Sequence, residues 1–237
     1  MKRGQLTIFI ILAIVILGAA TFYFTIGKNL SVLNPEQQKV FDFTQNCIDE
    51  SAKDVVYSVG LGGGYILPPE ISSDLGFPYY YYNNQNYMPS KIRIEEEMSN
   101  FIGERILNCT SDFKGFSDLK IESANPLSKA SIRDEKVVFA VDFPISIETD
   151  SGTSELKNFN SEVSVRFGIV YDSISEMMQE QMLHAGVCVN CALDIALKND
   201  LYVDMQDYDN ETILFDFKDE NSKINNETFE YVLLNKY

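Results

Sequence analysis

The hydrophobic pattern of the chain begins with an apolar run, Leu6 to Gly27, that contains no charged side chain. At about 1.5 Å of helical rise per residue, a run of this length matches a bilayer core of about 30 Å. A globular helix this long normally keeps a polar face, which the run lacks. A secretory signal peptide has a shorter apolar region, of about 7–15 residues, followed by a small-residue cleavage site. The run therefore predicts a transmembrane helix that remains on the mature chain.

Beyond the apolar run, hydrophobic residues recur at helical spacing in two segments. Residues 34–37 (Asn-Pro-Glu-Gln) have the residue types of a capping box with proline at the first helical position, and they predict a helix start. The glycine-rich segment 60–64 ends this helix. Because phosphate-binding glycine loops follow a strand, this segment is interpreted as a helix end and not as a phosphate cradle. A second helix is predicted at about 91–109, with Ser90 as its N-cap.

The spacing then changes to the alternation that is typical of strands. Residues 65–89 contain four prolines and are predicted as a long loop. Strands are predicted at 118–124, 129–134, 136–148 and 155–167, with a turn at Asp150-Ser151-Gly152. The remaining predicted elements are helices at 170–185 and 188–199 and strands at 201–206, 212–218 and 228–234, with turns at Asp209-Asn210 and Asn225-Asn226.

These elements indicate an α+β fold, in which an N-terminal transmembrane helix precedes helices packed on antiparallel sheets. The predicted organisation is a cytoplasmic leader at 1–5, the transmembrane helix at 6–27, an extracytoplasmic α+β domain at 28–168 and a helix-and-strand subdomain at 169–237.

Charge restricts the partners and orients the chain. The formal net charge is −16 at pH 7. Nucleic acid is excluded as a partner, because binding it requires clustered positive charge that displaces counterions from phosphates. The same acidity opposes docking of the folded part on anionic lipid. Lys2 and Arg3 precede the apolar run, and Lys28 follows it. The positive-inside rule then places the N-terminus in the cytoplasm and the C-terminal domain outside the cell.

The residues at the start of the chain read Lys2-Arg3-Gly4-Gln5-Leu6-Thr7. This motif resembles the class III signal peptide of archaeal type IV pilin-like proteins, in which the cleavage site precedes the apolar helix. The resemblance implies that a dedicated peptidase cuts between Gly4 and Gln5, and that the helix stays as an anchor or filament core. It also implies that copies of the chain, or other pilin-like subunits, are its partners. The rest of the chain resembles membrane-anchored surface proteins of archaea.

The chain departs from the pilin pattern at Phe9, where many pilins carry a glutamate that can meet the free amine of a neighbouring subunit. A glutamate inside lipid is expensive and would indicate a role in assembly. A minor pilin-like subunit or a lone anchored surface protein therefore fits the sequence as well as a major pilin does.

All four cysteines lie outside the apolar run, and their even number predicts disulfides in an oxidising compartment. Cys47 and Cys109 lie on the apolar faces of two predicted helices, so the simplest pairing joins them. On the chain-entropy model that bond contributes about 4 kcal/mol. The remaining pair, Cys188 with Cys191, is predicted to be a small structural disulfide at a helix start.

The Cys188-Val189-Asn190-Cys191 segment leaves two alternatives open. A thiol–disulfide enzyme uses a low-pKa cysteine at a helix N-terminus, the place predicted for Cys188. Such sites normally follow a strand, whereas a helix precedes this one. His184, the only histidine, would join these cysteines as zinc ligands, with Cys47 or Cys109 as a fourth. Zinc would require a compartment that keeps thiols reduced, so neither a metal nor a cofactor is predicted.

Tyrosines and asparagines are the remaining candidates for contacts with other molecules. Tyrosine rings provide large, stiff contact areas in binding surfaces, and the 65–89 segment contains Tyr79, Tyr80, Tyr81, Tyr82 and Tyr87. Candidate glycosylation sequons occur at Asn29, Asn210 and Asn226, whereas the sequon at Asn108 adjoins Cys109 and is expected to be buried.

Two groups of acidic residues are interpreted as ordinary surface. The run Glu95-Glu96-Glu97 is expected to be a solvated helix face. Asp204, Asp207, Asp209 and Asp216 could provide oxygen ligands for calcium, but they lack the spacing of an EF-hand.

The sequence thus predicts a non-enzymatic structural or interaction protein of the cell surface, pilin-like in its membrane anchor. An anchored thiol–disulfide redox protein that uses Cys188 and Cys191 is one alternative. An anchored module that binds a small solute or a glycan is the other.

Overall fold

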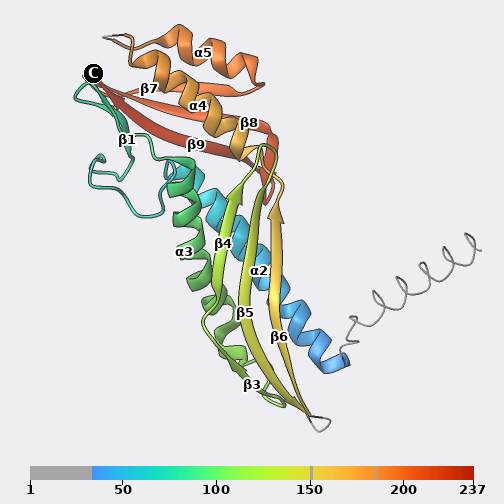
Figure 1. The fold of residues 1–237 in the computed structure, drawn as a ribbon. Helices are drawn as coiled ribbons and strands as arrows, with labels where there is room; N and C mark the ends of the chain where they lie inside the picture. The colour runs from blue at the N-terminus through green and yellow to red at the C-terminus, as the bar shows by residue number, and fades with distance from the viewer. Residues whose placement is uncertain (1–33, 150–151, 185) are drawn as a thin grey trace, which may run out of the picture. The chain divides into compact units, whose positions relative to one another are not determined.

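The computed structural model describes residues 34–149, 152–184 and 186–237. The chain divides into two units, residues 1–39 and 40–237, and the second unit contains both sheets (Figure 1).

The predicted leader and transmembrane helix, together with the cleavage site at Gly4 and Gln5 and the sequon at Asn29, lie outside the described residues. Among the residues that are described, no helix combines the length and the apolar character that crossing a membrane requires.

Helix α2 spans Pro35–Leu61 and begins with the predicted capping box. The side chain of Asn34 accepts a hydrogen bond from the backbone N–H of Gln37 at 2.8 Å, and the Gln37 side chain accepts one from the N–H of Asn34 at 3.1 Å. The helix ends in the glycine-rich segment, as predicted. Gly63 has a φ of +55°, and a Cβ atom there would collide with the carbonyl oxygen of Val232. The segment is therefore the end of a helix, and the strand that contains Val232 packs closely against it.

Helix α3 spans Lys91–Thr110 and is capped by Ser90, whose hydroxyl accepts a hydrogen bond from the N–H of Arg93 at 3.2 Å. A short 3₁₀ turn at Ser111–Phe113 follows it. Both the helix and its cap confirm the sequence prediction.

The acid run on α3 is not simply solvated, which corrects the sequence interpretation. Glu97 is buried and pairs with Arg93 at 2.6 Å. Glu95 accepts a hydrogen bond from the N–H of Ile132 at 2.8 Å, and the hydroxyl of Ser99 accepts one from the N–H of Ala130 at 2.8 Å. These two side chains occupy backbone donors of an outer strand, so α3 shields an edge that would otherwise be open to pairing.

The first sheet is antiparallel and is organised around one long strand. It contains β3 (Lys120–Ser123), β4 (Leu127–Ile132), β5 (Val137–Thr149) and β6 (Gly152–Val163). Strand β5 pairs with β6 along one side and with both β3 and β4 along the other. Alternate β5 side chains form the core: Val137, Phe139, Val141, Phe143, Ile145 and Ile147 are all buried. The predicted strands are confirmed.

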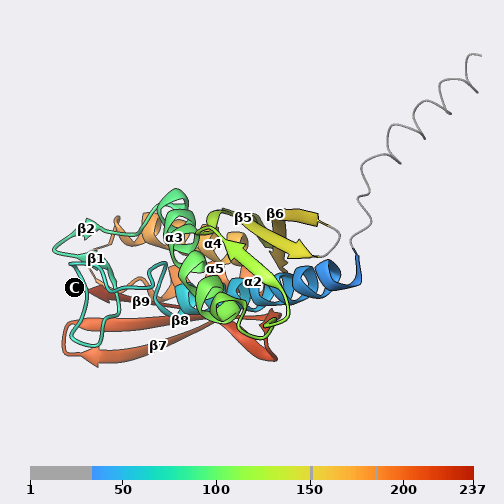
Figure 2. The ribbon, with the colours of Figure 1, turned by 90° about the horizontal axis from the view of Figure 1, so that it is seen from below.

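The second sheet has the order β2-β1-β9-β8-β7 (Figure 2). Its strands are β1 (Tyr79–Tyr82), β2 (Gln85–Asn86), β7 (Tyr202–Asp209), β8 (Thr212–Ile224) and β9 (Glu227–Lys236). Helices α4 (Phe167–Gln181) and α5 (Val189–Lys198) precede β7. The three C-terminal strands and both helices confirm the prediction, with α4 beginning and ending earlier than expected.

Strand β1 corrects the prediction of a continuous loop at 65–89. It pairs in parallel with β9, at the opposite end of the chain, so the sheets are not purely antiparallel. This pairing also crosses the predicted boundary between residues 168 and 169, and residues 40–237 form one compact unit. A pairing between such distant segments leaves no local signal in the sequence.

Arg166, between β6 and α4, connects the first sheet to the second. Its guanidinium forms an ion pair with Asp219 of β8 at 2.9 Å, and its backbone N–H donates to the hydroxyl of Ser222 at 2.8 Å. The same guanidinium donates to the carbonyl oxygens of Asn199 and Asp200, which lie between α5 and β7. Arg166 therefore connects the end of the first sheet to strand β8 and to the segment that precedes β7.

Candidate functional site

The structure contains two disulfides, and both join the predicted partners. Cys47 of α2 is bonded to Cys109 of α3, with a Cα–Cα distance of 5.6 Å and a sequence separation of 62 residues. Cys47 is buried, as expected for a residue on the apolar face of its helix. Cys109 and the neighbouring Asn108 are exposed, so the expectation that these two residues are buried is wrong. This first disulfide clamps two helices that are far apart in the sequence.

The second disulfide, between Cys188 and Cys191, has a Cα–Cα distance of 5.3 Å and a sequence separation of 3 residues. Cys188 is the N-cap residue of α5, and both cysteines are half-buried. The first residues of a helix leave backbone N–H groups without intrahelical acceptors. The sulfur of Cys188 therefore lies at a position where a negative charge is favoured.

A buried glutamine, Gln181, supports the loop that carries this disulfide. Its side-chain oxygen accepts hydrogen bonds from the N–H of Cys188 at 3.1 Å and from the hydroxyl of Tyr237 at 3.0 Å. Its side-chain nitrogen donates to the carbonyl oxygen of Gly186 at 2.9 Å. Nothing in the spacing of the sequence marked Gln181 or Tyr237, because they come from the end of α4 and the end of the chain and meet only in the fold.

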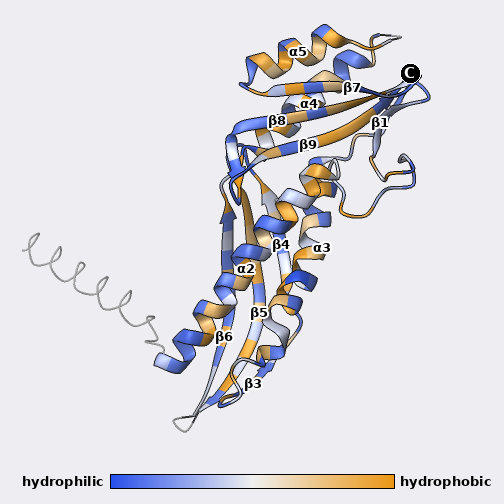
Figure 3. Cartoon of the chain, turned by 180° about the vertical axis from the view of Figure 1, so that it is seen from behind, coloured by the Kyte–Doolittle hydropathy of each residue, from blue (hydrophilic) through white to orange (hydrophobic). Residues whose placement is uncertain are grey.

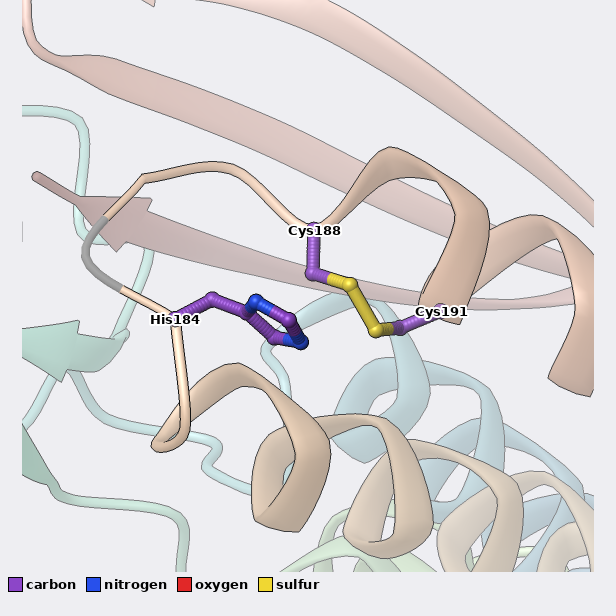
Figure 4. Close-up of side chains that lie close together, drawn as sticks. All are labelled: His184, Cys188 and Cys191. Carbon is purple, nitrogen blue, oxygen red and sulfur yellow. A yellow bond between two sulfur atoms is a disulfide. The ribbon is translucent and has the colours of Figure 1, made fainter.

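His184 lies next to the second disulfide, and its ring is directed toward the two sulfurs (Figure 4). One ring nitrogen of His184 and the Sγ atoms of Cys188 and Cys191 all lie within 4.8 Å of one another. Zinc needs deprotonated thiols, and here the two sulfurs are bonded to each other. Cys47 and Cys109, the candidates for a fourth ligand, are bonded to each other.

The four aspartates considered for calcium do not gather into a site. In residues 34–149, 152–184 and 186–237, the one group of potential metal ligands is His184 with Cys188 and Cys191. Asp216 instead pairs with Lys218 at 3.0 Å, and burial raises the pKa of its carboxyl group.

The tyrosine cluster is divided between the core and the surface. Tyr80 and Tyr81 are buried, so the prediction that they contact a partner is wrong for these two rings. The hydroxyl of Tyr80 donates to the carbonyl oxygen of Gly63 at 3.0 Å and lies 2.7 Å from the hydroxyl of Tyr231. The hydroxyl of Tyr81 donates to the side chain of Asn84 at 2.8 Å. Hydroxyl partners allow two adjacent strand residues to be buried together.

The other three rings of the cluster are half-buried and form a continuous row. The ring of Tyr82 lies 5.3 Å from that of Tyr79 and 6.5 Å from that of Tyr87. Tyr79 and Tyr87 also border a hollow of about 180 Å³ beside Tyr65 and Pro78. Pockets that enclose small ligands usually measure about 300–1,000 Å³, so this hollow suits one projecting side chain of a partner better than a solute.

The buried tyrosine pair makes the fold sensitive to alkali. Burial raises the pKa of Tyr80 and of Tyr231 above the ordinary value of 10.0. Above about pH 10 the unfolded chain ionises these phenols while the folded chain holds them neutral, so the free energy of unfolding falls with pH. Each phenol contributes a slope of about 1.4 kcal/mol per pH unit. We expect the variant with both Tyr80→Phe and Tyr231→Phe to be less stable than the parent at pH 8 and to lose less stability by pH 11.

Denaturant unfolding measured at both pH values tests this expectation, with Tyr202→Phe as the control because Tyr202 is 58% exposed. Equal losses between pH 8 and pH 11 in the parent and the double variant would show that the pair ionises freely in the folded chain.

The two described sequons lie in accessible turns. Asn210 follows β7, and Asn226 lies between β8 and β9 with a φ of +69°; both are exposed. Their glycosylation remains a prediction.

Comparison of the chain with models of protein families, with curated proteins and with solved structures finds no match.

Proposed function

We propose that this chain is a membrane-anchored protein of the cell surface, with a pilin-like N-terminal anchor and an extracytoplasmic α+β domain. The observation that carries the proposal is the charge-free run Leu6–Gly27, which directly follows the Gly4-Gln5 motif. A long apolar run behind a short basic leader is typical of a membrane anchor with a cytoplasmic N-terminus. The resemblance of the motif to class III signal peptides supports processing at Gly4-Gln5.

The domain beyond the anchor supports an extracytoplasmic location. All four cysteines form disulfides, and one of these closes a long loop between two helices. Disulfides persist in oxidising compartments and are rare in the cytosol. An acidic surface with a net charge of −16 also keeps copies of such a domain apart in solution.

The row Tyr79–Tyr82–Tyr87 is the surface that we propose for contact with another subunit or surface protein. These rings are partly accessible and lie close together. Tyr79 and Tyr82 belong to β1, and Tyr87 directly follows β2 and donates its backbone N–H to the carbonyl oxygen of Tyr80. Stiff aromatic rings lose little entropy on binding, so they suit such a contact.

Mass spectrometry of the N-terminal peptide tests the anchor and its processing. The full-length chain, with a C-terminal tag, is expressed in an archaeal host that has the class III peptidase. We expect a mature N-terminus at Gln5 and a protein that sediments with membranes and is released by detergent but not by high salt. The variant Gly4→Val is expected to stay uncut and still to sediment with membranes.

Different results would contradict the processing and the membrane anchor. An intact Met1 on the native chain would remove the pilin-like processing but leave the anchor. A parent chain that stays in the supernatant without detergent would remove the anchor itself.

A further inference from the structure

Exposed apolar side chains are concentrated around the second disulfide. Most of the large hydrophobic side chains that are exposed in the described residues lie in the stretch 182–202. Leu183 is 76% exposed, and Leu197 is 78% exposed. Figure 3 shows hydrophobic residues along α5. We name as the α5 patch the six exposed residues Met182, Leu183, Val187, Val189, Leu193 and Leu197.

Three of the six residues of the α5 patch belong to α5 itself, and they are regularly spaced. Val189, Leu193 and Leu197 are spaced four residues apart, which places them on one face of α5. The adjoining side of the helix is directed inward through Ala192, Ile195 and Ala196, which are buried. The apolar stripe of α5 is therefore wider than the part that the fold covers, and an apolar surface left exposed in this way is typical of a contact with a partner.

The disulfide lies at the N-terminal end of α5, between members of this patch in the sequence, and is accessible. Cys188 directly precedes Val189, and both cysteines are only half-buried. The sulfurs have a proton carrier, His184, within 4.8 Å. A disulfide that only clamps a loop needs neither a neighbouring imidazole nor an apolar border.

We infer that Cys188–Cys191 is an exchangeable disulfide that oxidises the dithiol of a partner protein, and that the α5 patch is where this partner docks. The partner must present two thiols surrounded by apolar surface, because a small thiol would not need the patch.

The exchange needs no other oxidant or reductant, because the electrons pass directly from the partner's thiols to the disulfide. A partner thiolate attacks Sγ of Cys188, the bond between Cys188 and Cys191 breaks, and its electron pair leaves on Sγ of Cys191, which His184 can protonate. The partner's second thiolate then attacks the partner's own sulfur in the mixed disulfide and releases Cys188 as a thiolate at the N-terminus of α5. Two electrons pass from the partner to this chain. The partner's two thiols release two protons to water as they become thiolates, Cys191 takes up one proton through His184, and Cys188 is left as a thiolate.

Differential labelling of thiols in the full-length chain, kept in detergent, tests the exchange. The protein is treated with dithiothreitol under native conditions, quenched at intervals with an alkylating reagent and mapped by mass spectrometry. The Cys47–Cys109 disulfide is the internal control. We expect Cys188 and Cys191 to be alkylated at least about tenfold faster than the control pair. Equal or slower labelling would overturn the inference.

Substitutions separate the docking surface from the chemistry. Reduced thioredoxin is the protein dithiol used as the probe. We expect Leu193→Gln to slow reduction by thioredoxin several-fold and to leave reduction by dithiothreitol unchanged. The control is Leu127→Gln, because Leu127 is 71% exposed on the first sheet, and it should change neither rate. An unchanged thioredoxin rate in Leu193→Gln would overturn the assignment of the patch.

Rescue by imidazole tests whether His184 supplies a proton to the exchange. We expect His184→Ala to slow reduction by both probes and free imidazole in the buffer to restore the rates, because imidazole can supply the same proton. A slow variant that imidazole does not rescue would assign His184 to support of the loop and would remove it from the exchange.

Discussion

Replacing Arg166 by methionine is expected to lower the free energy of unfolding by about 3–5 kcal/mol, because it leaves a buried carboxylate without its counter-charge. Asp219 is completely buried, and Arg166 is its cationic partner. The guanidinium donates to one carboxylate oxygen through Nε at 3.0 Å and reaches the other through Nη2 at 2.9 Å. This two-point arrangement is the strongest form of an arginine–carboxylate pair.

The loss extends beyond the ion pair, because the substitution also removes donors to two backbone carbonyls. The Arg166 guanidinium donates to the carbonyl oxygen of Asn199 at 3.0 Å and to that of Asp200 at 3.2 Å. Asp219 itself would keep hydrogen bonds from the hydroxyl of Ser222 and from the N–H of Asn221. These two donors satisfy part of the carboxylate but do not neutralise it.

Chemical denaturation of three variants separates these contributions. Arg105→Met is the matched control, since Arg105 is exposed on α3, and it should change stability by less than about 0.5 kcal/mol. The double variant Arg166→Met with Asp219→Leu should regain part of the loss, because a buried pair replaced by apolar side chains leaves no unpaired charge. A loss below about 1 kcal/mol in Arg166→Met would show that water reaches Asp219 in the folded chain.

The elements that the sequence predicted well are those whose pattern is decided by a single buried face. Strand β5 alternates buried and outward residues along its length, and α3 has one apolar stripe with a serine cap. Such patterns follow from local geometry, so they can be interpreted without knowing the partner element. The capping box of Asn34 and Gln37 is local in the same way.

Features that depend on a distant partner were missed or misjudged. Four consecutive tyrosines next to Pro78 predict a loop, yet Tyr80 lies in a buried strand. Its hydroxyl can be buried because the hydroxyl of Tyr231, from a distant strand, is a hydrogen-bond partner. Glu95 belongs to an acidic run, yet it accepts a hydrogen bond from a strand that follows it in the sequence.

The candidate redox site shows the same division between local and distant information. The spacing of Cys188 and Cys191 is visible in the sequence and predicts their disulfide. The support from Gln181 and Tyr237 arises only in the fold, where the end of α4 meets the end of the chain. Likewise, helical spacing places Val189, Leu193 and Leu197 on one face of α5, but only the structure shows that this face is exposed.

Removing the Cys47–Cys109 disulfide is expected to lower the free energy of unfolding by about 4 kcal/mol on the chain-entropy model. The bond joins residues separated by 62 positions, so it restricts a long loop in the unfolded chain. The variant Cys47→Ala with Cys109→Ala also leaves a space at the buried Cys47, which adds to the loss.

The chain supplies its own matched control in the second disulfide. Cys188 and Cys191 are separated by 3 positions, and on the same model their bond contributes only about 1.6 kcal/mol. Denaturant unfolding of Cys188→Ala with Cys191→Ala should therefore show a loss less than half as large as that of the first pair. Losses of equal size would mean that loop length does not determine how much each disulfide contributes to the free energy of unfolding. Local contacts at α5 would then account for the contribution of the second disulfide. A disulfide with so little influence on folding can be opened by exchange at a small cost in stability, whereas opening the bond between α2 and α3 is expected to cost more than twice as much.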